Sequence, residues 1–293
     1  MIRTIGNFVC ESLCVLALAL SLASCSGGSG SSDGGDLGGG SGGPPSSGLP
    51  KQCRDQPADA VSSLSIDPAS TGTGINASTG ADRHYVSAPG SAALRKDLLV
   101  LFLGGAFSVT DSYTRLTEFA AAVDGFGAIN LSYKNNTVVA SCGSAVDCNG
   151  NFRGETVFGE NTAYAPGART WSTSVISVPR QDSVINRFVN LIDYLAYPPT
   201  SVTFPANFPP PSYWSQFVST DARAPYITAH FGAVYPVWSK IILSGHSLGS
   251  GHAAFIATHL PIGAPVRRVA MFSGPDDTTD AAWLGDASAT LPM

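Results

Sequence analysis

Residues 241–255 read IILSGHSLGSGHAAF. An apolar run leads into a Gly-His-Ser-Leu-Gly turn, and small residues that suit a helix follow it. A serine placed between a strand and a helix is typical of a nucleophile elbow, whose tight backbone exposes the hydroxyl beside the N-terminus of the helix. Glycines two positions before and after the serine let strand and helix pass closely. The stretch therefore predicts Ser247 as a nucleophile and the Leu248 N–H as a donor to an oxyanion.

Gly-x-Ser-x-Gly alone is a weak signal, because Gly39–Gly43 also matches it in a segment with no strand or helix pattern. A second oxyanion donor should come from a loop that follows an earlier strand. The stretch LFLGGAFSVTDSY (101–113) has that form, and we expect the donor to be the N–H of Gly105 or Ala106. A plain turn that ends the strand would explain Gly104 and Gly105 equally well.

Alternating strand and helix patterns predict an α/β fold with a parallel sheet. The expected strands cover residues 82–89, 97–105, 128–133, 240–244 and 266–274. Helices are expected to start at Thr110-Asp111, at Asp182 and after Ser247. Residues 134–180 and 197–238 are expected to be irregular insertions. The second insertion is rich in Pro and aromatic residues, and it is either a lid or a long connection held by its own aromatic side chains.

The N-terminal residues indicate export. Residues 1–24 have a short apolar run after Arg3, and Leu22-Ala23-Ser24-Cys25 resembles the lipobox of bacterial lipoproteins. Cys25 would then carry a lipid; an ordinary cleavage site beside a cysteine is the alternative. Residues 25–52 are rich in Gly and Ser and predict a flexible tether, and the globular domain is expected over 53–293. The expected location is the bacterial cell envelope, anchored to the membrane.

Composition limits the partners. Only 13% of the 293 residues are charged and the net charge is −5, which argues against nucleic acid. Cys142 and Cys148 are close in sequence and are expected to form a disulfide in an oxidising compartment, which leaves Cys53 over. A metal site at this pair is unsupported, because no histidine or second cysteine pair is near. We expect neither metal nor cofactor, and the oligomeric state is open.

These motifs resemble the α/β-hydrolase superfamily, and more closely a group of bacterial exported α/β hydrolases of undefined substrate. The resemblance covers about residues 82–285 and rests on four stretches: LLVLFLGGAFS, DSVINRFVNLIDYL, WSKIILSGHSLGSGHAAFIA and RRVAMFSGPDD. It implies a mostly parallel sheet with helices on both faces, and an ester-type substrate. The group usually has a Pro-Gly-Thr-Gly-type loop at 104–107 and Gln at 248; both departures keep the backbone donors.

The resemblance also implies an acid and then a histidine after the serine. All five histidines, at 84, 230, 246, 252 and 259, lie at or before residue 259, so a base is not found where the resemblance places it. Asp276 and Asp277 could supply the acid, although GPDD also reads as a turn that caps a helix. We therefore expect a truncated chain that lacks the last two strands and is nearly inactive.

Two hypotheses follow from the sequence. The first is a membrane-tethered serine hydrolase of the carboxylesterase or lipase kind, acting on a small-molecule or lipid ester. The second is a surface-anchored binding protein that keeps the fold without catalysis.

Overall fold

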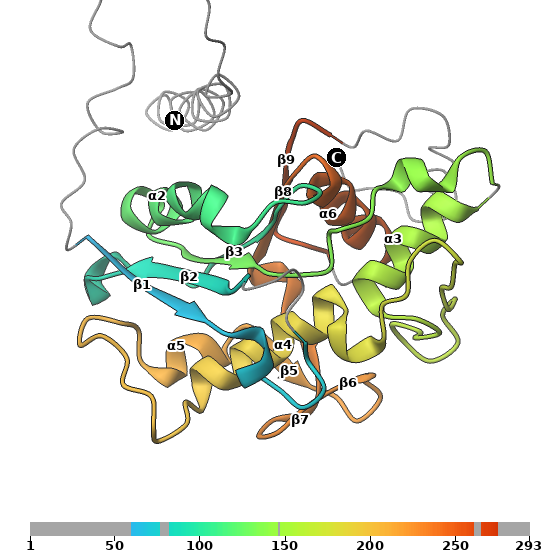
Figure 1. Cartoon of the computed structure of the whole chain (residues 1–293). Helices are drawn as coiled ribbons and strands as arrows, with labels where there is room; N and C mark the ends of the chain where they lie inside the picture. The colour runs from blue at the N-terminus through green and yellow to red at the C-terminus, as the bar shows by residue number, and fades with distance from the viewer. Residues whose placement is uncertain (1–59, 77–81, 146, 261–264, 275–293) are drawn as a thin grey trace, which may run out of the picture. The chain divides into compact units, whose positions relative to one another are not determined.

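The computed structural model describes residues 60–76, 82–145, 147–260 and 265–274. Their central feature is a six-stranded sheet with the order β1-β2-β4-β3-β8-β9 (Figure 1). The four strands β3, β4, β8 and β9 are parallel, and β1 and β2 continue the sheet antiparallel. The mostly parallel sheet confirms the expected fold class. The bounds are β1 Val61–Ile66, β2 His84–Pro89, β3 Leu99–Leu103, β4 Gly127–Leu131, β8 Ile241–His246 and β9 Arg268–Phe272.

Helices cover both faces of the sheet. α2 (Thr114–Asp124) lies on one side, and α4 (Val184–Ala196) lies on the other (Figure 1). Side chains alternate along β3, so Leu101 joins the main core with α4 and α6 (Leu248–His259), while Phe102 faces Tyr113 with the ring centroids 4.9 Å apart. The fully buried β3 thus separates two layers of helices, as a strand in a doubly covered sheet must.

The segment 134–180 contains a helix, α3 (Cys148–Phe158), where we expected irregular chain. Its sequence, CNGNFRGETVF, has two glycines and two asparagines and no clear apolar stripe, so local pattern gave no signal. Nearly all of its residues are buried, which means that packing against the rest of the domain stabilises the helix. Gly154 is required there, because a Cβ would lie 2.1 Å from the Trp171 ring.

The segment 197–238 is also regular in part. It holds α5 (Pro211–Ser215) and a three-stranded antiparallel sheet of β5 (Val218–Thr220), β7 (Gly232–Pro236) and β6 (Tyr226–Thr228). The aromatic residues Trp214, Phe217 and Tyr226 are fully buried in the main core. This favours a connection held by its aromatic side chains over a mobile lid. Short strands of three residues carry too little pattern to be recognised from sequence.

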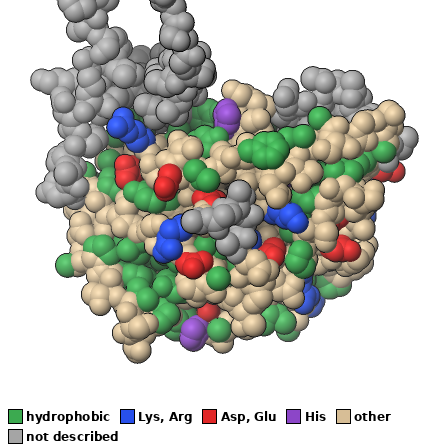
Figure 2. All heavy atoms as spheres, in the orientation of Figure 1, with side chains coloured by type: hydrophobic (Ala, Val, Ile, Leu, Met, Phe, Trp, Pro, Cys, Tyr) green, Lys and Arg blue, Asp and Glu red, His purple; other side chains and the backbone are tan. Residues whose placement is uncertain are grey.

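Figure 2, in the orientation of Figure 1, shows acidic and basic side chains intermixed with apolar ones on the surface of the domain. The ion pair between Arg187 and Asp182 is buried. Asp182, which we expected to open α4, accepts a hydrogen bond from Arg187 Nη2 at 2.7 Å, and Ser183 is the N-cap instead. Arg187 also donates to the Asp182 and Asn76 carbonyls, so it ties the start of α4 to the 67–76 segment.

We predict that Arg187→Met lowers the free energy of unfolding by about 3 kcal/mol, because it leaves the Asp182 carboxylate buried without its partner. Urea denaturation followed by circular dichroism measures the change. Arg223→Met is the matched control: Arg223 pairs with Asp221 at 2.8 Å, but its side chain is 76% exposed. Exposed pairs contribute little. Equal effects of the two substitutions would contradict the proposed importance of the buried pair.

Candidate active site

Ser247 occupies a strained turn between β8 and α6. Its φ is 50° and its ψ is −117°, a backbone conformation that residues with a side chain rarely adopt. The turn is possible because the neighbours are small: a Cβ on Gly245 would lie 2.4 Å from the Gly249 carbonyl, and one on Gly249 would lie 2.0 Å from the Leu103 oxygen. β8 therefore meets the first turn of α6 at backbone contact, and the geometry is that of a nucleophile elbow.

Hydrogen bonds hold the Ser247 backbone and leave its hydroxyl free. The Ser247 N–H donates to the Phe272 carbonyl of β9 at 2.9 Å, and the Ser247 carbonyl accepts from the Ser250 hydroxyl at 2.6 Å. Ser247 Oγ has no hydrogen-bond partner among the residues that the structure describes. A fixed backbone with a free hydroxyl is the arrangement that an attacking serine needs.

The loop 104–108 lies against the elbow, as the sequence predicted. A Cβ on Gly249 would also approach the Gly104 oxygen to 2.5 Å, and Ala106 packs on the small apolar cluster that contains the Leu248 side chain. Phe107, the next residue, has a φ of 59° and a side chain that is 66% exposed. The loop therefore turns sharply beside Ser247.

Hydrogen bonds fix the orientation of the peptide groups in this loop. The Gly105 carbonyl accepts from Asn135 Nδ2 at 2.9 Å and from the Ser108 hydroxyl at 2.7 Å. Because the C=O and N–H of one peptide unit point in opposite directions, these bonds turn the Ala106 N–H away from Asn135. The Ala106 N–H has no partner among the described residues. It is therefore a free donor on the loop that faces the elbow.

The neighbouring Gly105 N–H is engaged. It donates to the Tyr113 hydroxyl at 3.3 Å, and that hydroxyl lies 3.0 Å from His246 Nδ1. Burial lowers the pKa of His246, so the ring is neutral near pH 7 and its Nδ1 can accept the Tyr113 proton. Of the two donors that the sequence left open, Ala106 is the free one, and Gly105 is held by Tyr113.

The Leu248 N–H is the other free donor. It stands at the first position of α6, where a helix leaves its N–H groups unbonded, and no described residue accepts from it. The Leu248 carbonyl accepts a hydrogen bond from Nη1 of the buried Arg153 at 3.2 Å. Gly251 makes room for that guanidinium, since a Cβ there would lie 2.3 Å from it. Arg153 on α3 thus holds the first turn of α6.

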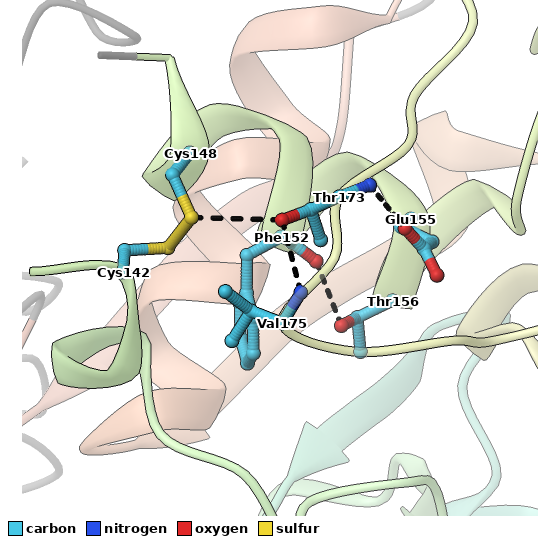
Figure 3. The surroundings of a disulfide bond; sticks show 7 residues. All are labelled: Cys142, Cys148, Phe152, Glu155, Thr156, Thr173 and Val175. Atoms are coloured by element: carbon cyan, nitrogen blue, oxygen red, sulfur yellow. Dashed lines mark hydrogen bonds between the residues drawn. A yellow bond between two sulfur atoms is a disulfide. The ribbon is translucent and has the colours of Figure 1, made fainter. Parts of the chain in front are cut away.

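A disulfide lies in the apolar cluster against which the Leu248 side chain packs. Cys142 and Cys148 are bonded, as expected from their spacing, and they belong to the same apolar cluster as Leu248 and Phe152 (Figure 3). Figure 3 also shows Glu155, which accepts from the Thr173 N–H at 2.9 Å and ties α3 to the 171–178 segment. Burial raises the pKa of Glu155. The disulfide and α3 together support the start of α6 at Leu248.

Two of the five histidines are core residues. His84 accepts a hydrogen bond from the Ser132 N–H at 3.1 Å, and burial lowers its pKa well below the usual value. His252 stacks on Phe152 at 6.1 Å and meets the Tyr133 ring edge-on, and burial also lowers its pKa well below the usual value. Both rings are therefore neutral packing groups.

The remaining histidines are engaged elsewhere. His246 contacts Tyr113, His230 binds Asp193 at 2.7 Å, and His259 stacks on Phe255 at 3.9 Å. Within the described part of the chain, none of the five hydrogen-bonds to Ser247. Asp276, Asp277, Cys25 and Cys53 lie outside the described residues.

The sequence pattern did not mark Tyr113, Tyr133 and Asn135, which position loop 104–108. It also did not mark Arg153, which holds the first turn of α6. Tyr133 donates to the Gly104 carbonyl at 2.6 Å. A signal for Tyr133 and Asn135 was present, because both follow β4, and the carboxyl ends of parallel strands meet at one edge of the sheet. Nothing in the pattern marked Arg153, which lies on the unexpected helix α3.

Comparisons with known proteins give structural likeness only. No family model and no curated protein matches the chain. Among solved structures it is similar to a bacterial heroin esterase, with 14% identity, a TM-score of 0.33, and coverage of 75% of this chain and 46% of that one. It is also similar to an inhibited esterase B from Lactobacillus rhamnosis, with 9% identity, a TM-score of 0.34, and coverage of 74% and 50%. The chain spans about half the length of these structures.

We predict that replacing both Cys142 and Cys148 with Ala lowers the free energy of unfolding by about 2 kcal/mol, the entropy that a short closed loop removes from the unfolded chain. Urea denaturation of the oxidised protein, the reduced protein and the double variant measures it. The reduced protein and the double variant should coincide. A double variant as stable as the oxidised protein would show that the disulfide does not support this region.

Proposed function

We propose that the chain carries the nucleophile and oxyanion hole of a serine hydrolase that acts on an ester. The observation that supports this most directly is the free Ser247 hydroxyl in a positive-φ turn, next to two free backbone donors, the N–H groups of Leu248 and Ala106. Backbone donors that are fixed before the reaction stabilise charge as it develops, which is the main source of rate enhancement in acyl transfer.

In the proposed reaction, Ser247 Oγ attacks the acyl carbon of the ester. Its proton passes to a base, and the carbonyl oxygen becomes negative and accepts hydrogen bonds from Leu248 N–H and Ala106 N–H. Tyr113 is a positioning residue in this proposal. By binding the Gly105 N–H and His246, it holds the loop so that the Ala106 donor keeps its direction.

On this proposal none of the five histidines is the base in the arrangement described, and Asp276 or Asp277 is a candidate for the acid. The protein would then show little activity as the 293-residue chain, because removing the base from such a unit costs several orders of magnitude in rate. The competing proposal is a binding protein with the fold of a hydrolase. It is supported by the engagement of all five histidines away from Ser247.

We further propose that the protein is exported and anchored through a lipid on Cys25, with residues 25–52 as a tether. The disulfide in the domain supports an oxidising compartment. Among the described helices, none has the length and apolar character to cross a bilayer.

The hydrolase proposal predicts a slow, Ser247-dependent hydrolysis of p-nitrophenyl acetate that added imidazole accelerates. Imidazole supplies the missing base, while an oxyanion hole without a base is expected to give roughly a thousandfold acceleration over water. The measurement is the initial rate of the full chain against imidazole concentration, after subtraction of the Ser247→Ala rate, which accounts for catalysis by free imidazole. Identical imidazole dependence in both proteins would refute the nucleophile and favour the binding protein.

Two further outcomes separate the parts of the proposal. If hydrolysis is fast without imidazole and Ser247→Ala abolishes it, the nucleophile is confirmed. The proposal that none of the five histidines acts as the base would then be wrong. Tyr113→Phe should lower the Ser247-dependent rate about tenfold with little change in KM, because a loosened donor weakens transition-state binding more than substrate binding. An unchanged rate would remove Tyr113 from the account of the loop.

A further inference from the structure

A cavity lined by both polar and apolar groups lies apart from Ser247. Its volume is about 580 Å³, and three segments form it: the turn at 69–73, one side of α4, and the β6–β7 connection at 227–230. Among the described residues, its lining includes none from the elbow or the loop 104–108. The volume falls within the range of small-molecule sites, so the cavity can hold a ligand of its own.

A buried carboxylate orients the histidine of this cavity. Asp193 Oδ2 binds His230 Nδ1 at 2.7 Å, and Asp193 Oδ1 accepts from the Thr228 hydroxyl and from the His230 and Phe231 N–H groups. The Asp193 side chain is only 4% exposed, whereas that of His230 is 49% exposed. The carboxylate is therefore fully engaged, and Nε2 of the half-exposed His230 ring has no hydrogen-bond partner among the described residues.

An aromatic face stands next to this histidine. The Tyr197 ring stacks on His230 with the centroids 4.6 Å apart and the planes 19° apart, and Phe231 meets Tyr197 edge-on at 5.1 Å. Tyr197 is 46% exposed although it is aromatic. A half-exposed ring fixed by two neighbours offers a flat apolar surface at the edge of the cavity.

Two side-chain amides on α4 offer unused acceptors to the cavity. Asn186 Nδ2 donates to the Gln181 carbonyl at 2.8 Å, and Asn190 Nδ2 donates to the Asn186 carbonyl at 2.9 Å. These bonds fix both amides, and their Oδ1 atoms have no hydrogen-bond partner within the described ranges. Gly72 leaves the second one open, since a Cβ there would lie 2.7 Å from Asn190 Oδ1. Both asparagines are at least nine-tenths buried.

The chemistry of these groups points to a ligand with many hydroxyls. Each hydroxyl can both donate and accept, so it matches amide oxygens and an imidazole nitrogen. Tyr194 is also among the residues that line the cavity. The C–H face of a sugar ring would lie on the exposed Tyr197 ring. A metal is not indicated, because the described residues contain no group of three His, Cys, Asp or Glu side chains that could hold one. Arg180 also lines the cavity, and a ligand held mainly by its positive charge would be an acidic sugar.

We propose that this cavity binds a neutral saccharide of one or two rings, independently of the proposed chemistry at Ser247. Asn186 and Asn190 accept hydrogen bonds from its hydroxyls, and Tyr197 stacks on one face. Such a site would hold the protein on a glycan while the elbow on another part of the domain remains free.

A glycan array of neutral and acidic mono- to tetrasaccharides, probed with the labelled full chain, tests this. The best neutral glycan is then titrated by calorimetry against the wild type, Asn190→Leu, Tyr197→Ala and the surface control Leu94→Ala. We expect binding to a neutral glycan, at least tenfold weaker in both cavity variants and unchanged in Leu94→Ala, whose side chain is 52% exposed and lies outside the lining.

Binding to no glycan, or binding that both cavity variants leave unchanged, would overturn the proposal. Binding to acidic glycans alone would contradict the proposal of a neutral saccharide and would indicate that Arg180 holds the ligand. If Asn190→Leu fails to fold, the Tyr197→Ala result decides the question, because a half-exposed ring can be removed without opening the core.

Discussion

The positive φ of Ser247 is the constraint on which the site depends. A non-glycine residue keeps such a conformation only where the surroundings leave it no alternative. Here β8 is held by β3 on one side and β9 on the other, and the Ser247 N–H is itself bonded to β9. The start of α6 lies in backbone contact with the end of β3. Packing of the sheet therefore supports the strain in the turn.

The same packing brings loop 104–108, with the free Ala106 N–H, beside the elbow. β3 and β8 are neighbours with Leu103 opposite Gly245, so the loops that follow the two strands begin side by side. Tyr113, Tyr133 and Asn135 then fix the peptide groups of loop 104–108. Tyr113 precedes α2, and Tyr133 and Asn135 follow β4, so the orientation of this loop depends on two segments that lie outside it.

The strands of the central sheet could be read from the sequence because they are continuous apolar runs, and the elbow could be read because glycines flank Ser247. The first strand, β1, was missed, since VSSLSI is half polar and lies at the antiparallel edge. α3 was missed because burial, not helix propensity, stabilises it. The choice between Gly105 and Ala106 depended on hydrogen bonds to Tyr113 and Asn135, contacts between distant segments that spacing in the chain does not encode.

If Ser247, Leu248 and Ala106 form one preorganised acyl-transfer site, a crystal structure of the protein reacted with diethyl p-nitrophenyl phosphate will show it most directly. We expect a covalent phosphoryl group on Ser247 Oγ, with one phosphoryl oxygen about 3 Å from both the Leu248 and the Ala106 nitrogens. An adduct on Ser247 whose oxygens meet neither nitrogen would contradict the oxyanion hole. An adduct on another residue, with Ser247 unmodified, would contradict the claim as a whole.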